Sequence, residues 1–351
     1  MSDVILDRRD LSFQLFEVLD TDTLFQRPRF AEHSRETIEA ALDTAEKLAR
    51  EKFANHNSLA DKDEPTFVDG KVVMRPEVKT AFDAYINAGF LSSRASFEEG
   101  GMQLPEIAAA ACKGMFTCVN PSSTGYAFLT AAAANVIRNF ASDTLRSQFL
   151  EPMMAGRFTG TMALTEPHAG SSLADIRTRA VPQEDGSYRL KGNKIYISGG
   201  DNELADNIVH LVLARLPDAP EGVKGISLFL APKYLLDAEG RLGEHNQLRV
   251  GSIEHKLGIH GPPTCVMLFE GAKAELIGQP NQGLAHMFTM MNSARLNVGV
   301  QGVAVAERAY QQALAFSLER PQGRSAWTGA NPSRLFDHPD VRRMLMLMKA
   351  K

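Results

Sequence analysis

Apolar residues recur at helical spacing through most of the first 155 residues. In residues 35–55 they are spaced as on one face of a helix, at Ile38, Leu42, Ala45, Leu48 and Ala49. The next segment has Pro76 at a helix start and Gly89 at its end. Residues 106–118, 122–140 and 144–154 also predict helices, several of them apolar on all sides. The pattern predicts a helical bundle in which some helices are buried all round.

The pattern changes at Gly156. Short β-rich runs such as "FTGTMAL", "SYRLKGNKIYIS", "NIVHLVLARL" and "GISLFLA" follow, separated by Gly, Pro, Asp and Asn. They predict an antiparallel sheet or barrel. From Gln282 the pattern is helical again, and the proline-free, small-residue-rich segment 283–319 predicts one helix more than about 50 Å long. We interpret Gly299 and Gly302 within it as sites of close helix packing, and residues 340–351 begin another helix.

These changes of pattern predict an α+β multidomain protein. We expect an N-terminal extension (1–34), an N-terminal helical domain (35–157), a middle antiparallel β domain (158–275) and an incomplete C-terminal helical domain (276–351). The polar stretch "NHNSLADKDEPTFVDG" is interpreted as a linker. The first junction between helical and β character precedes "TMALTEPHAGSS", and domain junctions are preferred places for ligand sites.

Composition narrows the function. Lys and Arg number 38 and Asp and Glu 42, so the net charge of −4 gives no electrostatic reason to expect a nucleic-acid partner. The three cysteines have no C-x-x-C spacing, which predicts buried thiols in a reducing compartment rather than disulfides or zinc ligands: Cys112, Cys118 and Cys265. Neither a signal peptide nor a membrane-length apolar run is found, so we expect a soluble, cytoplasmic protein.

Common catalytic and nucleotide-binding motifs are absent from the sequence. It contains no G-x-G-x-x-G after a strand, no G-x-x-x-x-G-K-[ST], no H-E-x-x-H and no G-x-S-x-G. His255 and His260 form the densest histidine pair. We interpret them as polar loop residues rather than as metal ligands.

Two strand ends remain as candidates. "TMALTEPHAGS" and "KIYISGG" each combine a strand end, a hydroxyl (Thr165 or Ser198) and a following glycine, and Pro167 and Gly170 predict a sharp turn in the first. If the two ends are neighbours, they would present backbone donors, two hydroxyls and the Tyr196 ring to a planar ligand such as an isoalloxazine. The alternative is two ordinary turns with Tyr196 in the core.

Four segments, taken in order, resemble the acyl-CoA dehydrogenase flavoprotein family. "ALTEPHAGSS" resembles the family's first signature, and "KIYISGG" its second flavin-contacting strand. "SFEEGGM" is similar to an acidic Gly-Gly loop, and "MNSARLNVGVQG" begins a segment similar to the long helix that opens the C-terminal bundle. The N-terminal extension and "HPDVRRMLM" are similar to the larger bacterial members, which include methylmercaptopropionyl-CoA dehydrogenases.

The resemblance implies FAD as cofactor and an acyl-CoA as substrate. It places Met162, Leu164 and Thr165 on one side of the flavin, and Tyr196, Ile197 and Ser198 on the other, with the Ser198 hydroxyl near N5. It also implies that Gly170 and Ser171 contact the pyrophosphate and the acyl-CoA. Arg320 and Gln322 would reach the cofactor of a neighbouring subunit. Asn292 and Arg295 would contact the substrate. As alternatives, Met162 and Leu164 are plain core, Ser171 is a turn residue and Arg320 a solvated helix-end charge.

The implied reaction removes a proton from the α carbon of the thioester and passes a hydride from the β carbon to flavin N5. Some family members carry the required glutamate where this chain has Ala294, and others in a Tyr-Glu-Gly segment that does not occur before Lys351. No catalytic residue is therefore assigned, and we expect the chain to be the front portion of a longer enzyme. Ser172, where Asp is common in the family, puts little in doubt.

The resemblance also implies an electron-transferring flavoprotein as electron acceptor and a homodimer or homotetramer. Two alternatives stay open. One is an acyl-CoA oxidase, in which oxygen reoxidises the flavin, and the other is a non-catalytic module that binds acyl-CoA or flavin.

Overall fold

The computed structural model describes residues 5–350, in which no helix is both long and apolar enough to cross a membrane. The chain divides into two compact units. The first combines residues up to Glu51 with 104–121 and 298–351, and the second combines residues 52–103 with 122–297. The predicted α+β fold class, with helices before and after a β domain along the chain, is confirmed.

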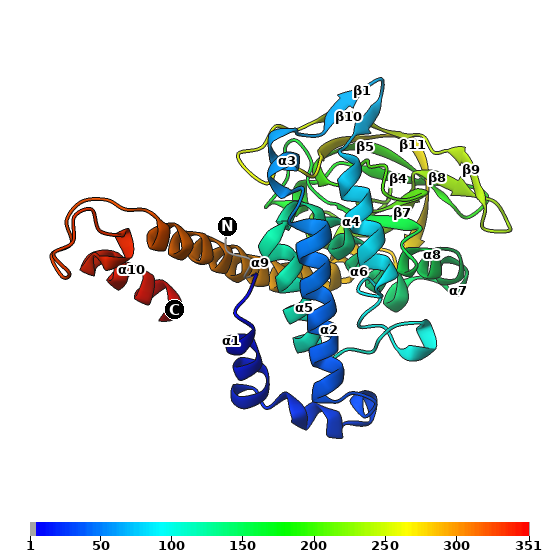
Figure 1. Ribbon diagram of the computed structural model, residues 1–351. Coiled ribbons are helices and arrows are strands. Elements are labelled where there is room, and N and C mark those ends of the chain that lie inside the picture. The colour runs from blue at the N-terminus through cyan, green and yellow to red at the C-terminus, as the bar shows by residue number, and fades with distance from the viewer. Residues whose placement is uncertain (1–4, 351) are drawn as a thin grey trace. The chain divides into compact units, whose positions relative to one another are not determined.

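The first unit is built from helices. Ser34 caps α2, since its hydroxyl accepts from the Thr37 N–H while the Thr37 hydroxyl accepts from the Ser34 N–H. The apolar face of α2 is buried, and α2 and α5 lie side by side (Figure 1). The α-helices in the described part of this unit are α1 (Arg8–Ser12), α2 (Arg35–Leu48), α5 (Glu106–Val119), the part of α9 (Gly283–Glu319) from residue 298, and α10 (Pro339–Ala350).

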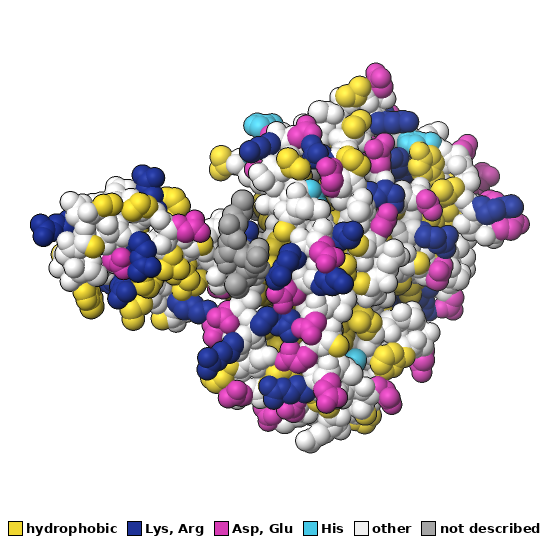
Figure 2. Space-filling model, viewed as in Figure 1, with side chains coloured by type: hydrophobic (Ala, Val, Ile, Leu, Met, Phe, Trp, Pro, Cys, Tyr) yellow, Lys and Arg dark blue, Asp and Glu magenta, His cyan; other side chains and the backbone are white. Residues whose placement is uncertain are grey.

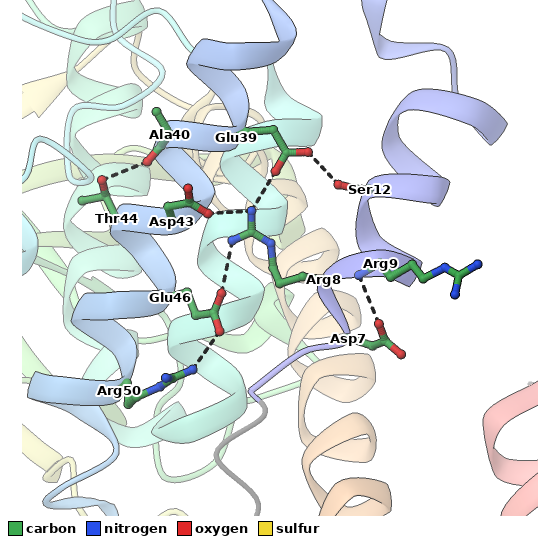
Figure 3. A network of polar contacts seen from close by, with 10 residues as sticks. All are labelled: Asp7, Arg8, Arg9, Ser12, Glu39, Ala40, Asp43, Thr44, Glu46 and Arg50. Carbon is green, nitrogen blue, oxygen red and sulfur yellow. Dashed lines mark hydrogen bonds and ion pairs between the residues drawn. The ribbon is translucent and has the colours of Figure 1, made fainter.

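One arginine joins α1 to α2 (Figure 3). The Arg8 guanidinium lies 2.7 Å from Glu39, 2.9 Å from Asp43 and 3.2 Å from Glu46, three carboxylates on one face of α2. Ser12 at the end of α1 donates a hydrogen bond to Glu39. Without the guanidinium, these carboxylates would repel one another across successive turns of α2.

We expect Arg8→Met to lower the free energy of unfolding by about 1–2 kcal/mol at low salt, because a partly buried network loses its shared cation. Urea unfolding at about 20 mM and 500 mM NaCl checks this, since salt screens the repulsion and should shrink the loss. Arg9→Met is the matched control, because the Arg9 side chain points away from the network (Figure 3). Equal losses for both variants, or a loss independent of salt, would contradict the prediction.

Close helix packing at Gly299 and Gly302 was predicted and is not found. A Cβ added at either position would meet no atom of the described chain within 4 Å. Large apolar side chains are exposed on the same part of α9, and hydrophobic side chains also gather on the surface of α10 (Figure 2). Those on α9 are Val298, Val303, Val305, Phe316 and Leu318, and those on α10 are Met344, Met346, Leu347 and Met348.

Most helices of the second unit precede its sheet, with a small hairpin among them, and residues 283–297 of α9 follow the sheet. The prediction of a linker at residues 55–70 is wrong, because this segment contains a helix and the first strand of the hairpin. Only Val72 of the hairpin is buried, and its N–H donates to the Asp201 carboxylate. The elements are α3 (Asn57–Lys62), β1 (Thr66–Val68), β2 (Lys71–Val73), α4 (Pro76–Asn87), α6 (Pro121–Phe140), α7 (Asp143–Leu145) and α8 (Glu151–Met154).

The sheet of the second unit has seven strands in the order β10-β11-β5-β4-β6-β3, with β7 paired to both β11 and β6. The pairs β11–β5, β5–β4, β4–β6, β6–β7 and β7–β11 therefore close a circuit, as in a small barrel. A separate hairpin joins β8 (Tyr234–Leu236) to β9 (Leu242–His245). The seven strands are β3 (Phe158–Ala163), β4 (Arg179–Pro182), β5 (Tyr188–Ser198), β6 (Asn207–Arg215), β7 (Ile226–Pro232), β10 (Leu248–Ile253) and β11 (Thr264–Ile277).

The sheet is not purely antiparallel, which corrects the sequence prediction. Strand β3 runs parallel to β6, from the pair Phe158 and Asn207 to the pair Ala163 and Val212. Alternate residues of β6 belong to two different cores, so this strand is apolar almost throughout. A Cβ at Gly160 of β3 would lie 2.6 Å from the Ala133 Cβ, so β3 and α6 approach as closely as they do only because the residue is glycine.

All three cysteines are free and buried, as predicted. Burial raises the pKa of Cys112 and of Cys265 to about 12, and that of Cys118 to about 11. Thiols with such high pKa values carry almost no thiolate at neutral pH and are poor nucleophiles.

Candidate functional site

The two strand ends singled out in the sequence are neighbours. The N–H of Ile195 in β5 donates to the carbonyl of Thr165, just beyond the end of β3, at 2.9 Å. The neighbourhood that the flavin hypothesis requires is therefore confirmed. Thr165 is half-buried, whereas Ser198 is exposed. The two hydroxyls thus come from segments joined by a backbone hydrogen bond.

A β-bulge turns the Tyr196 ring outward. Ile197 pairs with Cys265 but Lys194 pairs with Met267, so β5 has one more residue than β11 between these pairs. Tyr196 has a φ of 58° and is 61% exposed, which rules out the alternative that its ring lies in the core. A left-handed backbone is strained for a large side chain, and such strain concentrates at functional sites. An exposed ring on a strained backbone supports a role in binding.

The first strand end continues into a tight loop. Glu166 and Ala169 exchange two backbone hydrogen bonds around Pro167 and His168, and the next residues, among them Ser171, are exposed. Gly170 does not have a positive φ, and a Cβ there would meet only the Thr165 methyl, at 3.5 Å. The predicted sharp turn is confirmed, but Gly170 is not needed for a left-handed conformation.

Three of the predicted flavin contacts are side chains of the two cores. Leu164 is buried in the core between the sheet and the helices, and Met162 packs against it partly buried. Ile197 is buried in the other core. The other predicted residues at the two strand ends are open to solvent. Thr165 is half-buried, and Gly170, Ser171, Tyr196 and Ser198 are exposed.

A buried ion pair between the two strand ends was missed in the sequence. The Lys194 ammonium is fully buried and lies 2.8 Å from the Glu166 carboxylate, which is 3% exposed. Glu166 also accepts hydrogen bonds from the N–H groups of Arg177 and Thr178. Burial lowers the pKa of Lys194 to about 8. Burial alone would raise the pKa of Glu166. The nearby Lys194 ammonium and the hydrogen bonds that Glu166 accepts outweigh this effect, so the pKa of Glu166 is lowered. The sequence offered only a lysine just before the apolar run at Ile195–Ile197 and a glutamate just after the end of β3.

Two glycines follow Ser198 and let the chain turn closely against its neighbours. Gly199 has a φ of 63° and donates its N–H to the Pro263 carbonyl. A Cβ at Gly200 would lie 2.8 Å from both the Cys265 Cβ and the Met267 sulfur. Glycine is therefore required here.

The remaining predicted residues lie on α9 and after it. Arg295 and Asn292 are exposed and joined by a 3.0 Å hydrogen bond, and the Arg295 guanidinium lies over the Phe288 ring. Arg320 and Gln322, in the other compact unit, are exposed where the chain leaves α9. Their backbones pair with the returning chain near Ser333. The structure tests none of their binding roles, which stay predictions.

His255 and His260 lie in the loop that joins β10 to β11, with ring centroids 5.7 Å apart. No group of three or more His, Cys, Asp or Glu side chains within the described residues could hold a metal ion. Instead the loop is attached to α3 and the residues after it. His255 contacts Glu64 at 3.0 Å, and the backbone N–H of His260 donates to the Asp61 carboxylate. The same loop leads into Thr264, the strand partner of Ser198.

Attachment of this loop is expected to weaken as pH rises. The two ring nitrogens of His260 face the carbonyls of Asp61 and Lys256, and only the imidazolium donates to both. The Lys256 carbonyl and the nearby carboxylates raise the His260 pKa above about 6.5. The added stability is therefore complete below about pH 6.5 and is lost as pH rises through the raised pKa.

Amide hydrogen exchange of residues 254–263 at pH 6 and pH 8, corrected for the intrinsic rate, measures this effect. His260→Gln should abolish the pH dependence, whereas His245→Gln, an exposed histidine of the same unit, should preserve it. The titratable groups facing His260 are Asp61 and Glu64, with His255 from its own loop, whereas Lys256 contributes its backbone carbonyl. Protection that is unchanged by pH in the wild type would contradict the prediction.

A family model described as "Acyl-CoA dehydrogenase, middle domain" matches residues 161–272. The matched range includes both strand ends, the loop after Thr165 and most of β11.

Curated relatives match almost the whole chain. A 3-methylmercaptopropionyl-CoA dehydrogenase of Ruegeria pomeroyi is 40% identical over 343 residues, which cover 97% of this chain and 58% of the relative. A butyryl-CoA dehydrogenase of Syntrophomonas wolfei is 36% identical, and the broad-specificity linear acyl-CoA dehydrogenase FadE5 of Mycobacterium tuberculosis is 35% identical, with the same shares covered. The chain thus spans less than two thirds of the length of these relatives.

Solved structures share the fold. Butyryl-CoA dehydrogenase from Megasphaera elsdenii superposes with a TM-score of 0.73 at 22% identity, covering 91% of this chain and 76% of that one. Caenorhabditis elegans ACDH-11 in complex with C11-CoA has a TM-score of 0.80 at 20% identity, covering 99% of this chain and 57% of that one.

Proposed function

Since the chain belongs to the acyl-CoA dehydrogenase family, we propose that it carries the flavin-binding part of an FAD-dependent enzyme that removes hydrogen from the α and β carbons of an acyl-CoA thioester. The observation that carries this proposal is the 2.9 Å hydrogen bond between Ile195 and Thr165, which brings the two strand ends together. Relatives over 97% of the chain are named as dehydrogenases of acyl-CoA thioesters, which supports the same reaction class.

The exposed groups of the two strand ends suit a flat, hydrogen-bonding cofactor. Thr165 and Ser198 offer hydroxyls, and Tyr196 offers an exposed ring whose backbone is held by the bulge. Gly170 and Ser171 would meet the pyrophosphate and the acyl-CoA. Leu164 and Ile197 are buried, so they would contact the ring through the backbone. FAD, when bound, would supply a two-electron acceptor, for which no side chain of the protein can substitute.

The substrate side of the proposal rests on α9 and the chain after it. Asn292 and Arg295 would face the acyl-CoA, and Arg320 and Gln322 would reach the cofactor of a neighbouring subunit in a homodimer or homotetramer. We further propose a cytoplasmic enzyme that passes its electrons to an electron-transferring flavoprotein. Ala294 cannot act as a base, so this position of α9 does not supply the carboxylate for α-proton removal.

Titration with FAD tests the proposal. We expect the purified chain to bind one FAD with quenched flavin fluorescence, and the double variant Thr165→Ala with Ser198→Ala to bind at least about tenfold more weakly, because two hydrogen bonds of about 1 kcal/mol each are lost. Ser252→Ala, an exposed hydroxyl on β10, is the control and should bind as the wild type does. A colourless protein that takes up no FAD would refute the proposal.

A non-catalytic binding module is the second candidate, and Ala294 favours it. The 351 residues are expected to show no reduction of an artificial electron acceptor with acyl-CoA substrates of several chain lengths. Anaerobic bleaching of the bound flavin by any of them would show that a base is present and would exclude the binding module. Peroxide formation without an added acceptor would indicate an oxidase instead.

A further inference from the structure

Lys194 connects three consecutive residues of the first strand end to β5. Its ammonium donates to the Leu164 carbonyl at 2.9 Å and to the Glu166 carboxylate at 2.8 Å. The N–H of the next residue, Ile195, donates to the carbonyl of Thr165. Residues 164, 165 and 166 are therefore each bonded to Lys194 or to its neighbour.

Glu166 extends this connection to the far side of the loop. Its two carboxylate oxygens accept from the N–H groups of Arg177 and Thr178, at 2.6 and 3.0 Å. The residues between, 167–176, include Gly170 and Ser171. One carboxylate thus closes the loop whose tip is proposed to meet the pyrophosphate, while its lysine partner anchors the base of that loop to the strand that carries Tyr196 and Ser198.

Stability alone does not account for a pair buried so deeply. Removing both ions from water costs several kcal/mol each, and apolar side chains of similar volume often serve a core equally well. An ion pair does impose direction, because the ammonium must point at its acceptors and the carboxylate at its donors. Here the backbone acceptor of the ammonium is the Leu164 carbonyl, just before Thr165, and the backbone donors to the carboxylate are the Arg177 and Thr178 N–H groups at the far end of the loop.

We propose that Lys194, through its pair with Glu166, is a positioning residue of the flavin site that sets Thr165 and the loop after it in register with Tyr196 and Ser198. This inference rests on the proposed function, since the cofactor it positions is the proposed FAD. Lys194 is too deeply buried to touch a ligand, so it acts only through the residues it holds.

The test compares Lys194→Met with Ile277→Ala. Ile277 is equally buried but lies at the other end of β11, so its truncation should lower thermal stability without touching the strand ends. In Lys194→Met we expect FAD to bind at least about tenfold more weakly and the amides of Ile195, Arg177 and Thr178 to exchange at least about tenfold faster. Ile277→Ala should leave both readouts as in the wild type.

Wild-type FAD affinity together with wild-type exchange in Lys194→Met would overturn the positioning role, as would equal changes in Ile277→Ala. If Lys194→Met does not fold, Glu166→Gln replaces it in the test. We then expect the amides of Arg177 and Thr178 to exchange faster than in the wild type and FAD to bind more weakly. A wild-type protein that binds no FAD would refute the proposed function. Because the exchange readout needs no cofactor, it would still show whether the pair holds the strand ends together.

Discussion

Gly283→Ala is expected to lower the free energy of unfolding by about 3 kcal/mol, a large share of the roughly 5–15 kcal/mol that holds a typical domain folded. A Cβ at Gly283 would lie 2.2 Å from the Ser227 carbonyl carbon and 2.3 Å from the Leu228 nitrogen. Both are backbone atoms of β7, so no side-chain rotation relieves the overlap. The first turn of α9 would have to move away from the sheet. Met287 and Met290, further along α9, pack in the core beside that sheet.

Differential scanning calorimetry measures this loss, and a drop in the unfolding midpoint of at least about 5 °C is expected. Gly299→Ala is the matched control in the same helix, since its Cβ would meet nothing within 4 Å. Alanine favours helix by about 1 kcal/mol over glycine, so this variant should be as stable as the wild type or slightly more stable. A Gly283→Ala protein that unfolds at the wild-type midpoint would show that α9 does not approach β7 as closely as described.

Tyr196→Gly is expected to weaken FAD binding by about 10- to 100-fold with little loss of stability. The exposed ring offers stacking contact of the kind that contributes about 1–3 kcal/mol with planar bases. Glycine at a φ of 58° relieves about 1–2 kcal/mol of backbone strain, which offsets its greater freedom in the unfolded chain. Affinity and stability should therefore respond separately to this substitution.

Fluorescence titration with FAD, alongside thermal unfolding of the cofactor-free chain, measures both quantities. Tyr196→Phe is the control, because it keeps the ring and the bulge and should bind FAD within about threefold of the wild type. Equal affinity for Tyr196→Gly and the wild type would remove Tyr196 from the proposed site. A large loss of stability in Tyr196→Gly would mean that the ring serves the fold.

Helices were predicted well where local signals end them. The bounds of α9, Gly283–Glu319, agree with the prediction, since no proline interrupts it and Gly283 and Arg320 border it. Pro76 begins α4 as expected. The hairpin of β1 and β2 was missed because only one of its residues, Val72, is buried, so its strands show no clear alternation of apolar and polar residues. The Asp201 carboxylate that anchors the hairpin lies far along the chain.

Pairings between distant segments could not be predicted from spacing alone. Nothing local in β3 or β6 distinguishes a parallel neighbour from an antiparallel one, and the pair of Glu166 with Lys194 spans 28 positions. Gly299 and Gly302 have no packed neighbour among the described residues for a related reason, since small residues permit close packing but do not supply the partner.

The candidate site was predicted in part. The two strand ends were placed correctly because each shows a hydroxyl and a glycine after an apolar run. The exposure of Tyr196 was not predictable, because a bulge depends on the register with β11. The burial of Lys194 was hidden for the same reason, since the bulge decides which residues of β5 face inward.

The first compact unit takes its residues from three separate stretches of the chain, and this imposes an order on biosynthesis. Helices α1 and α2 leave the ribosome long before residue 298, about 250 residues later, which at ~5–20 residues per second is roughly 12–50 s. Meanwhile residues 52–103 and 122–297 have all emerged. The sheet can therefore mature on the nascent chain after α2 has met α5 but before α9 and α10 complete the first unit.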